Sequence, residues 1–258
     1  MLAFRTELQK IFSTRLWWIL LLVGVAISGG MGILIASNVA MSPGAPSSAF
    51  SYSYSVAGRV SYLVPLLLGT LIITNEYRYQ TLSRTLLLGF SRRTVILSKM
   101  AVVAVVAFCI GVVCTTINAT VVFAVVTAGG KDSMLSAPEQ LGILWRTPFA
   151  FVLWGFVGLG FGLLLRNQIA SIISVLGFVL VVEPVLTTLA GESDVFATVG
   201  KFLPGAANLS LIWPPDSSFT GSVVQNLPWE QGGAVMALYG VLLIGCGYVF
   251  AFRRRDIF

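Results

Sequence analysis

The chain has 258 residues, of which 57% are hydrophobic and only 10% charged, with a formal net charge of +6. Soluble domains carry roughly 25% charged residues, and a soluble fold of this size has too little interior to bury so much apolar surface. Basic residues lie between apolar runs instead of gathering on one hydrated face, which argues against nucleic-acid binding. With no histidine and three cysteines at no ligand spacing, we expect no metal site.

The first 15 residues predict an amphipathic helix. Apolar Phe4, Leu8, Ile11 and Phe12 follow the spacing of one helix face. Such a helix would lie in the inner membrane interface, although a simple extension of the first span is an alternative. The uncharged run 16–36 is too long for a signal peptide and Glu7 spoils a basic leader, so we expect a retained transmembrane helix.

Five more apolar runs are long enough, or nearly so, to cross about 30 Å of hydrocarbon. They cover residues 54–74, 100–128, 149–165, 169–189 and 233–252. The predicted fold class is therefore an all-α polytopic membrane protein with six transmembrane helices, forming one transmembrane domain over 1–258. Within the outer segment 190–232, the amphiphilic stretch 202–213 could form a re-entrant hairpin, which would have to be helical or packed on protein.

The distribution of basic residues predicts the orientation. With the N-terminus inside, only Arg59, Lys131, Arg146 and Lys201 fall on the outer side, and the other basic residues face inward. An excess of Lys and Arg marks the cytoplasmic side. We therefore expect both termini in the cytoplasm and a multi-pass protein of the plasma membrane.

The largest inner segment, 75–99, is too apolar for a free loop and too charged for a span. This pattern predicts a short helix along the membrane, offered to a cytoplasmic partner. Glu76 and Arg78 alone fit ordinary interfacial anchoring equally well. The chain lacks a G-x-x-x-x-G-K-[ST] loop, so any ATP-driven work must be done by another polypeptide.

Several motifs resemble the ABC-2 family of ATP-binding-cassette transporter permeases. Glu76-Tyr77-Arg78 with Thr81, followed by Arg92-Arg93-Thr94-Val95 and Lys99, is similar to that family's inner segment. Further matching stretches are Val181-Val182-Glu183-Pro184, Phe202-Leu203-Pro204-Gly205-Ala206 and Phe252-Arg253-Arg254-Arg255-Asp256. Gln80 and the proline-free Gly89-Phe90-Ser91 depart from the family pattern.

The resemblance implies a half-size permease of an exporter for an amphiphilic substrate. Two copies, identical or homologous, would form the pathway in the lipid bilayer, each docked to a separate ATPase subunit. ATP and Mg would be bound by that partner, leaving no cofactor and no catalytic residue in this chain. The implied ATPase-coupling residues are Glu76, Arg78, Thr81, Arg92 and Arg93.

The alternative function is a secondary transporter driven by an ion gradient. That class usually shows intramembrane ionisable relays and repeated halves, whereas only Glu183 and Arg59 qualify here. A membrane-embedded enzyme is disfavoured because nucleophile–base sets are missing. Glu183 could contact substrate, pair with Arg59 at similar outer depth, or simply lie near the outer interface.

Gly158 and Gly162 form a G-x-x-x-G pattern in the fourth span. Glycines let helices approach closely. Packing within one subunit is favoured over a specific dimer seam.

Overall fold

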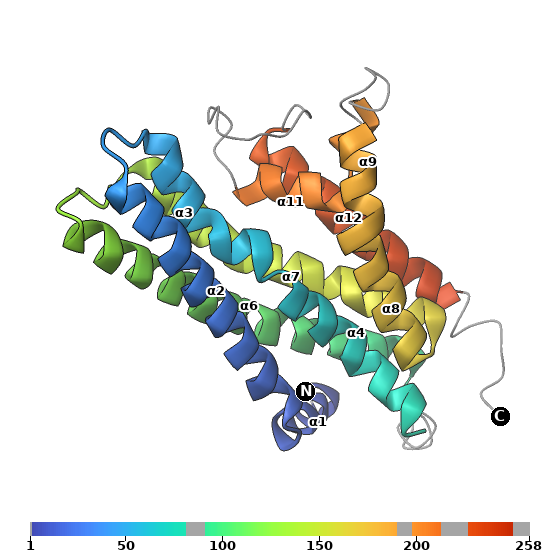
Figure 1. Ribbon diagram of the computed structural model, residues 1–258. Helices are drawn as coiled ribbons and strands as arrows, with labels where there is room; N and C mark the ends of the chain where they lie inside the picture. The colour runs from blue at the N-terminus through green and yellow to red at the C-terminus, as the bar shows by residue number, and fades with distance from the viewer. Residues whose placement is uncertain (1, 81–90, 190–197, 213–226, 250–258) are drawn as a thin grey trace.

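The computed structural model describes residues 2–80, 91–189, 198–212 and 227–249, and within these ranges the chain is helical without a strand. Figure 1 shows long helices in one bundle, with the short N-terminal helix α1 at one end. The elements are α1 (Leu2–Ser13), α2 (Leu16–Met41), α3 (Ser47–Val60), α4 (Leu63–Arg78), α6 (Arg92–Ala128), α7 (Pro138–Leu165), α8 (Gln168–Gly177), η1 (Phe178–Val182), α9 (Glu183–Leu189), α11 (Pro204–Ile212) and α12 (Trp229–Gly247).

Six helical segments are long and apolar enough to span a membrane, which confirms the predicted fold class. The first five of them are longer than the sequence predicts. The third span is α6, with 37 residues, or about 55 Å of helix against roughly 30 Å of hydrocarbon. Its first turns include Arg92 and Lys99, so residues 92–99 continue the span and do not belong to a separate surface helix.

The second span is divided into α3 and α4. A turn at Ser61 and Tyr62 separates them, and Pro65 follows in the first turn of α4. Proline cannot donate a backbone hydrogen bond and tends to kink a continuous helix. The Ser61 hydroxyl at this turn forms a buried hydrogen bond with the hydroxyl of Ser28 on α2, at 2.7 Å.

Glycine contacts hold α4 against α7 at the centre of the bundle. A Cβ atom at Gly69 would lie 2.0 Å from the carbonyl oxygen of Gly155, and one at Gly158 would lie 1.9 Å from that of Leu66. Backbones this close leave no room for side chains. The Thr70 hydroxyl also donates to the Gly158 carbonyl at 3.1 Å.

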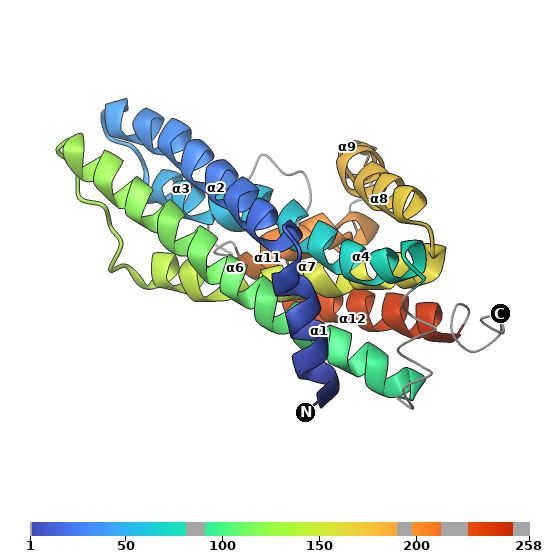
Figure 2. The ribbon, with the colours of Figure 1, turned by 90° about the horizontal axis from the view of Figure 1, so that it is seen from below.

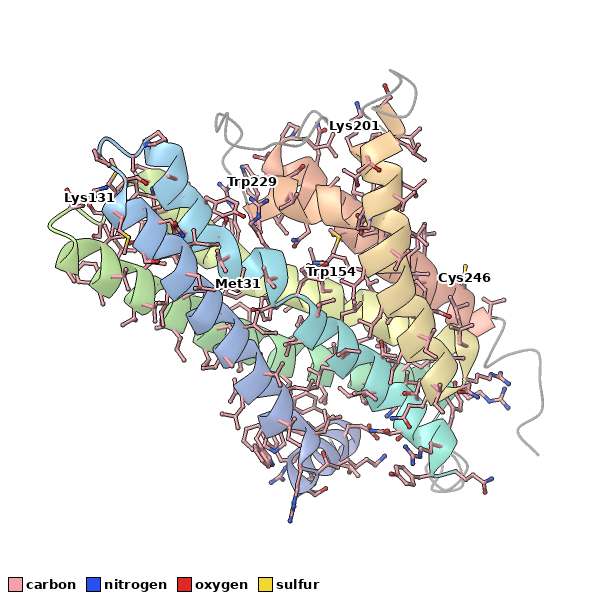
Figure 3. All side chains as sticks on the ribbon, viewed as in Figure 1. Met31, Lys131, Trp154, Lys201, Trp229 and Cys246 are labelled. Atoms are coloured by element: carbon pink, nitrogen blue, oxygen red, sulfur yellow. The ribbon has the colours of Figure 1, made fainter. Side chains whose placement is uncertain are left out.

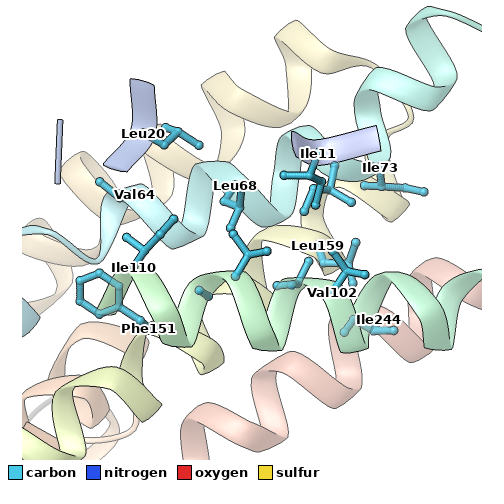
Figure 4. Packing of buried hydrophobic residues seen from close by; sticks show 14 of the residues in the cluster. Ile11, Leu20, Val64, Leu68, Ile73, Val102, Ile110, Phe151, Leu159 and Ile244 are labelled. Atoms are coloured by element: carbon cyan, nitrogen blue, oxygen red, sulfur yellow. The ribbon is translucent and has the colours of Figure 1, made fainter. Parts of the chain in front are cut away.

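The main hydrophobic core surrounds this central pair. Figure 4 shows Leu68 and Ile73 of α4 packed with Val102 of α6 and Leu159 of α7. Ile11 of α1 joins the same cluster. The amphipathic N-terminal helix is therefore part of the packed fold. Figure 2, which shows the molecule from below, shows this helix turned across the direction of α6.

Candidate functional site

Four ionisable side chains meet where α1 crosses α4 and α6. The Lys99 ammonium lies 2.6 Å from Glu7 Oε2 and 2.9 Å from Glu76 Oε1. The Lys10 ammonium lies 2.5 Å from Glu7 Oε1 and 2.9 Å from Glu76 Oε1. We call Glu7, Lys10, Glu76 and Lys99 the charged cluster; it joins three helices through two acids and two bases.

The cluster is mostly withdrawn from solvent. The exposed fraction is 5% for Glu7 and Glu76 and 1% for Lys99, while the Lys10 side chain is 39% exposed. A buried charge is tolerated when it is paired and hydrogen-bonded, and removing one partner is strongly destabilising. The cluster therefore fixes α1 on the ends of α4 and α6.

Ion pairing overrides burial in setting the pKa values of the α1 side chains. Burial works to raise the pKa of Glu7, but Lys99 and Lys10 outweigh it and lower that pKa below its usual value. Burial works to lower the pKa of Lys10, but Glu7 and Glu76 raise it above its usual value. Both side chains are therefore held in their charged forms at neutral pH.

Local sequence explains how each member reaches the cluster. Glu7 and Lys10 are three residues apart on α1 and so share a helix face. Glu76 lies in the last turn of α4, and Lys99 lies two turns into α6. A cavity of about 300 Å³ opens beside them and is also bordered by Asn75 and Tyr79 of the α4 end.

The structure separates Glu76 from the other predicted coupling residues. Arg78 and Arg93 are exposed and Arg92 is half-buried at the start of α6, whereas Glu76 is buried in the cluster. Arg78 donates from Nη1 to Gln168 Oε1 at 2.9 Å, across to the α7–α8 turn. Thr81 lies outside the described residues.

The sequence patterns predict a functional role for Glu76 but not for Glu7, Lys10 or Lys99. Lys99 is part of a family motif, and Glu7 is a charge that argues against a signal peptide. The available signal was charge in apolar surroundings: Lys99 precedes a long uncharged run, and Glu7 and Lys10 interrupt an amphipathic face.

Away from the charged cluster, the Glu183 carboxylate caps the N-terminus of α11. Its Oε1 accepts a hydrogen bond from the Gly205 amide at the start of α11, and it is 6% exposed. A Cβ atom at Gly205 would lie 2.7 Å from that oxygen, so a larger residue there would have to displace the Glu183 carboxylate. A carboxylate at a helix N-terminus satisfies free amides and opposes the helix dipole.

A π-helical turn precedes this cap. The Glu183 amide donates to the Phe178 carbonyl, five residues back, at the end of η1. Pro184 follows and has no amide to donate, and a widened turn relieves the clash that its ring makes with a regular helix. Glu183 lies six residues before the end of α9, or about 9 Å, so α11 begins beside the fifth span about 9 Å before the end of α9.

Arg59 and Glu183 interact with different groups. The Arg59 guanidinium lies over the Tyr52 ring, 4.6 Å from its centroid, and Glu183 is bound to the α11 backbone. α11 is instead anchored to α3 by Asn208, which donates to the Gly58 carbonyl at 3.1 Å. The hydrogen bond found at Glu183 favours structural use of this carboxylate.

Gly158 and Gly162 both face α4 of the same chain. A Cβ atom at Gly162 would lie 2.4 Å from Ile73 Cγ2, one turn along from the Gly158 contact. The neighbouring Gly160 faces α12 instead, where a Cβ atom would lie 2.4 Å from that of Leu243. The glycines thus pack α7 between two helices of its own subunit.

Six spans around a glycine-packed centre, with a charged cluster at one end, define a polytopic α-helical membrane protein. The sequence matches the family model for the ABC-2 family transporter protein over residues 3–183. This chain belongs to the ABC-2 transporter family and is a membrane-spanning permease component of an ABC transporter. The match includes the cluster and ends at Glu183. No curated protein sequence matches the chain.

Proposed function

We propose that the chain is the permease subunit of an ABC exporter, forming the translocation pathway with a second copy and driven by separate ATPase subunits. Each ATPase would bind ATP and Mg. The observation that carries this proposal is the charged cluster, because it connects the base of the expected ATPase-docking segment to three helices of the membrane domain.

Force would enter between α4 and α6. Glu76 lies two residues before Arg78, the last residue of α4, and Lys99 lies seven residues after Arg92, the first of α6. Both ends of the intervening segment are therefore held by one neutral set of ion pairs. A displacement of that segment by a closing ATPase would pass through Glu76 to α4 and through Lys99 to α6.

Within this proposal Arg92 and Arg93 contact the ATPase and Glu76 transmits the movement. Arg93 is exposed at the start of α6 and can meet an acidic or polar groove, whereas the buried Glu76 carboxylate cannot reach a docked protein. Charges on a docking rim set association and register more than they set the fold.

We infer the membrane orientation from the basic residues at the two ends of the bundle. α1 and the exposed arginines lie at one end of the bundle, and Figure 3 shows Lys131 and Lys201 at the opposite end. We place the α1 end in the cytoplasm of a plasma-membrane protein, with both termini on that side.

Co-purification with candidate ABC ATPase subunits tests the proposal. Replacing both Arg92 and Arg93 by Glu should reduce the recovered ATPase severalfold while the permease still inserts. Lys201→Glu, which reverses one charge at the other end, is the control and should leave recovery unchanged. ATP-independent, proton-driven transport by the purified chain alone, or undiminished recovery with the reversed pair, would contradict the assignment.

A further inference from the structure

A short turn joins α7 to α8 beside the end of α4. Arg166 closes α7 with φ 53° and ψ 1°, in the left-handed region, and its amide donates to the Gly162 carbonyl at 3.3 Å. Asn167 then caps α8, its Oδ1 accepting from the Ala170 amide at 3.1 Å. Figure 1 shows this turn next to the α4 end.

A pocket of about 430 Å³ lies between the turn and α4. Its lining residues are Tyr77, Arg78, Arg166, Asn167, Gln168 and Ile169. Two guanidinium groups border it, and no carboxylate is among these residues. The N-terminus of α8 adds the positive end of a helix dipole. The pocket therefore has the charge of an anion-binding site.

Two donors in this lining have no hydrogen-bond partner within the described part of the chain. They are the Tyr77 hydroxyl and Arg166 Nη2, and both atoms are buried. Leaving a buried donor unpaired is costly, more so for a charged group. An oxyanion seated among Tyr77, Arg78 and Arg166 would supply the missing acceptors.

The backbone conformation of Arg166 also indicates that its side chain serves anion binding. A left-handed residue after a helix is usually glycine, because other side chains are strained there. This chain holds an arginine in that conformation. Strain of this kind is a reason to look for a function of the side chain, and the pocket provides one.

Exposed apolar side chains identify the source of the anion. Ile169 borders the pocket and is 71% exposed, and Ile173, one turn further on the same face of α8, is 65% exposed. In a bilayer this face meets acyl chains. Basic pockets between membrane helices on the cytoplasmic side bind anionic lipid headgroups. We propose that this pocket binds the phosphate of an anionic phospholipid whose acyl chains lie along α8.

Native mass spectrometry of protein extracted from phosphatidylcholine nanodiscs containing phosphatidylglycerol tests the site. The wild type should retain phosphatidylglycerol in preference to phosphatidylcholine. Arg166→Gly should weaken retention about fivefold, as expected for loss of one basic contact at a membrane surface. This variant also suits the left-handed backbone, so it should fold normally. Arg78→Gln should weaken retention similarly.

Arg93→Gln is the matched control, because it removes an equal charge from the same end of the molecule outside the pocket. It should leave lipid retention unchanged and reduce ATPase recovery. Arg166→Gly should instead weaken lipid retention and leave ATPase recovery unchanged. The lipid site would thus stand even if the ATPase proposal failed.

Three results would overturn the lipid site. The first is equal retention of the two lipids, and the second is displacement of phosphatidylglycerol by free inorganic phosphate. The third is loss of ATPase recovery in Arg166→Gly with lipid retention intact, which would assign the pocket to a protein carboxylate.

Discussion

Replacing Lys99 by methionine tests the charged cluster most directly. Lys99 is 1% exposed and holds two carboxylates, Glu7 at 2.6 Å and Glu76 at 2.9 Å. Methionine fills similar space but cannot compensate either acid. The variant leaves two buried carboxylates with Lys10 as their remaining cluster cation.

Removing one partner of a buried pair costs about 3–5 kcal/mol. Lys10 still contacts both acids, and water can enter the neighbouring cavity of about 300 Å³, so we expect the lower end, about 3 kcal/mol. For a chain of this size that corresponds to a fall in Tm of about 6–12 °C. Thermal unfolding in a mild detergent measures it.

The double variant Lys99→Met with Glu76→Gln separates charge balance from packing. It leaves the pair of Glu7 and Lys10, 2.5 Å apart, so the remaining charges are balanced. We expect it to regain more than half of the stability lost in Lys99→Met. A double variant as unstable as the sum of the single changes would show that the residues act independently and would refute the reasoning. Lys201→Met, at the far end of the molecule, is the control.

Acid weakens the same ion-pair cluster without mutation, because it protonates Glu7. The pKa of Glu7 is lowered from 4.5, so its contribution to stability is present above about pH 4.5 and is lost as pH falls through the lower folded-state value. The pKa of Lys10 is raised from 10.5, so its contribution is lost only as pH rises through the higher folded-state value. Stability from this pair should therefore be constant between about pH 5 and 10.

Two further predictions concern the glycine contacts and the α11 cap. Gly69→Ala should lower the free energy of unfolding by about 3 kcal/mol or more, because the new Cβ would lie 2.0 Å from the Gly155 carbonyl oxygen. The control is Gly30→Ala, whose Cβ would meet no neighbouring atom within 4 Å. It should cause no loss in the same unfolding assay. Glu183→Ala should cost about 1 kcal/mol through loss of a helix cap, while Glu183→Gln keeps an acceptor, should cost less and should leave membrane insertion intact. Equal melting temperatures for the two Glu183 variants would argue against capping.

Hydropathy predicted the six spans because each apolar run exceeds what a soluble protein tolerates. It misjudged their ends where charged residues lie inside a continuous helix. Lys99 is compensated by Glu7 and Glu76, so α6 begins at Arg92, and α7 begins at Pro138, well before the expected residue 149. A hydropathy window treats each charge as a penalty and cannot recognise that a distant residue pairs with it.

The charged cluster was beyond prediction for the same reason. Its members are separated by up to 92 positions in sequence, and only the folded chain brings them together. The contact between Glu183 and Gly205 is similar: both residues stood out in matching motifs, yet neither motif specifies its neighbour. Pro65, by contrast, is a sequence signal for the break in the second span, since proline disturbs a continuous helix.

The packing limits where a transport motion can occur. α4 and α7 touch through backbone at Gly69 and Gly158, so neither can slide past the other without a severe clash, and α12 approaches α7 closely at Gly160. The fifth span is different. Along α8, η1 and α9 the buried residues are Ser171, Val175, Val179 and Glu183, a single stripe at four-residue spacing. A push received at the charged cluster would move α4 and α7 together, and relative displacement would meet least steric resistance against the fifth span.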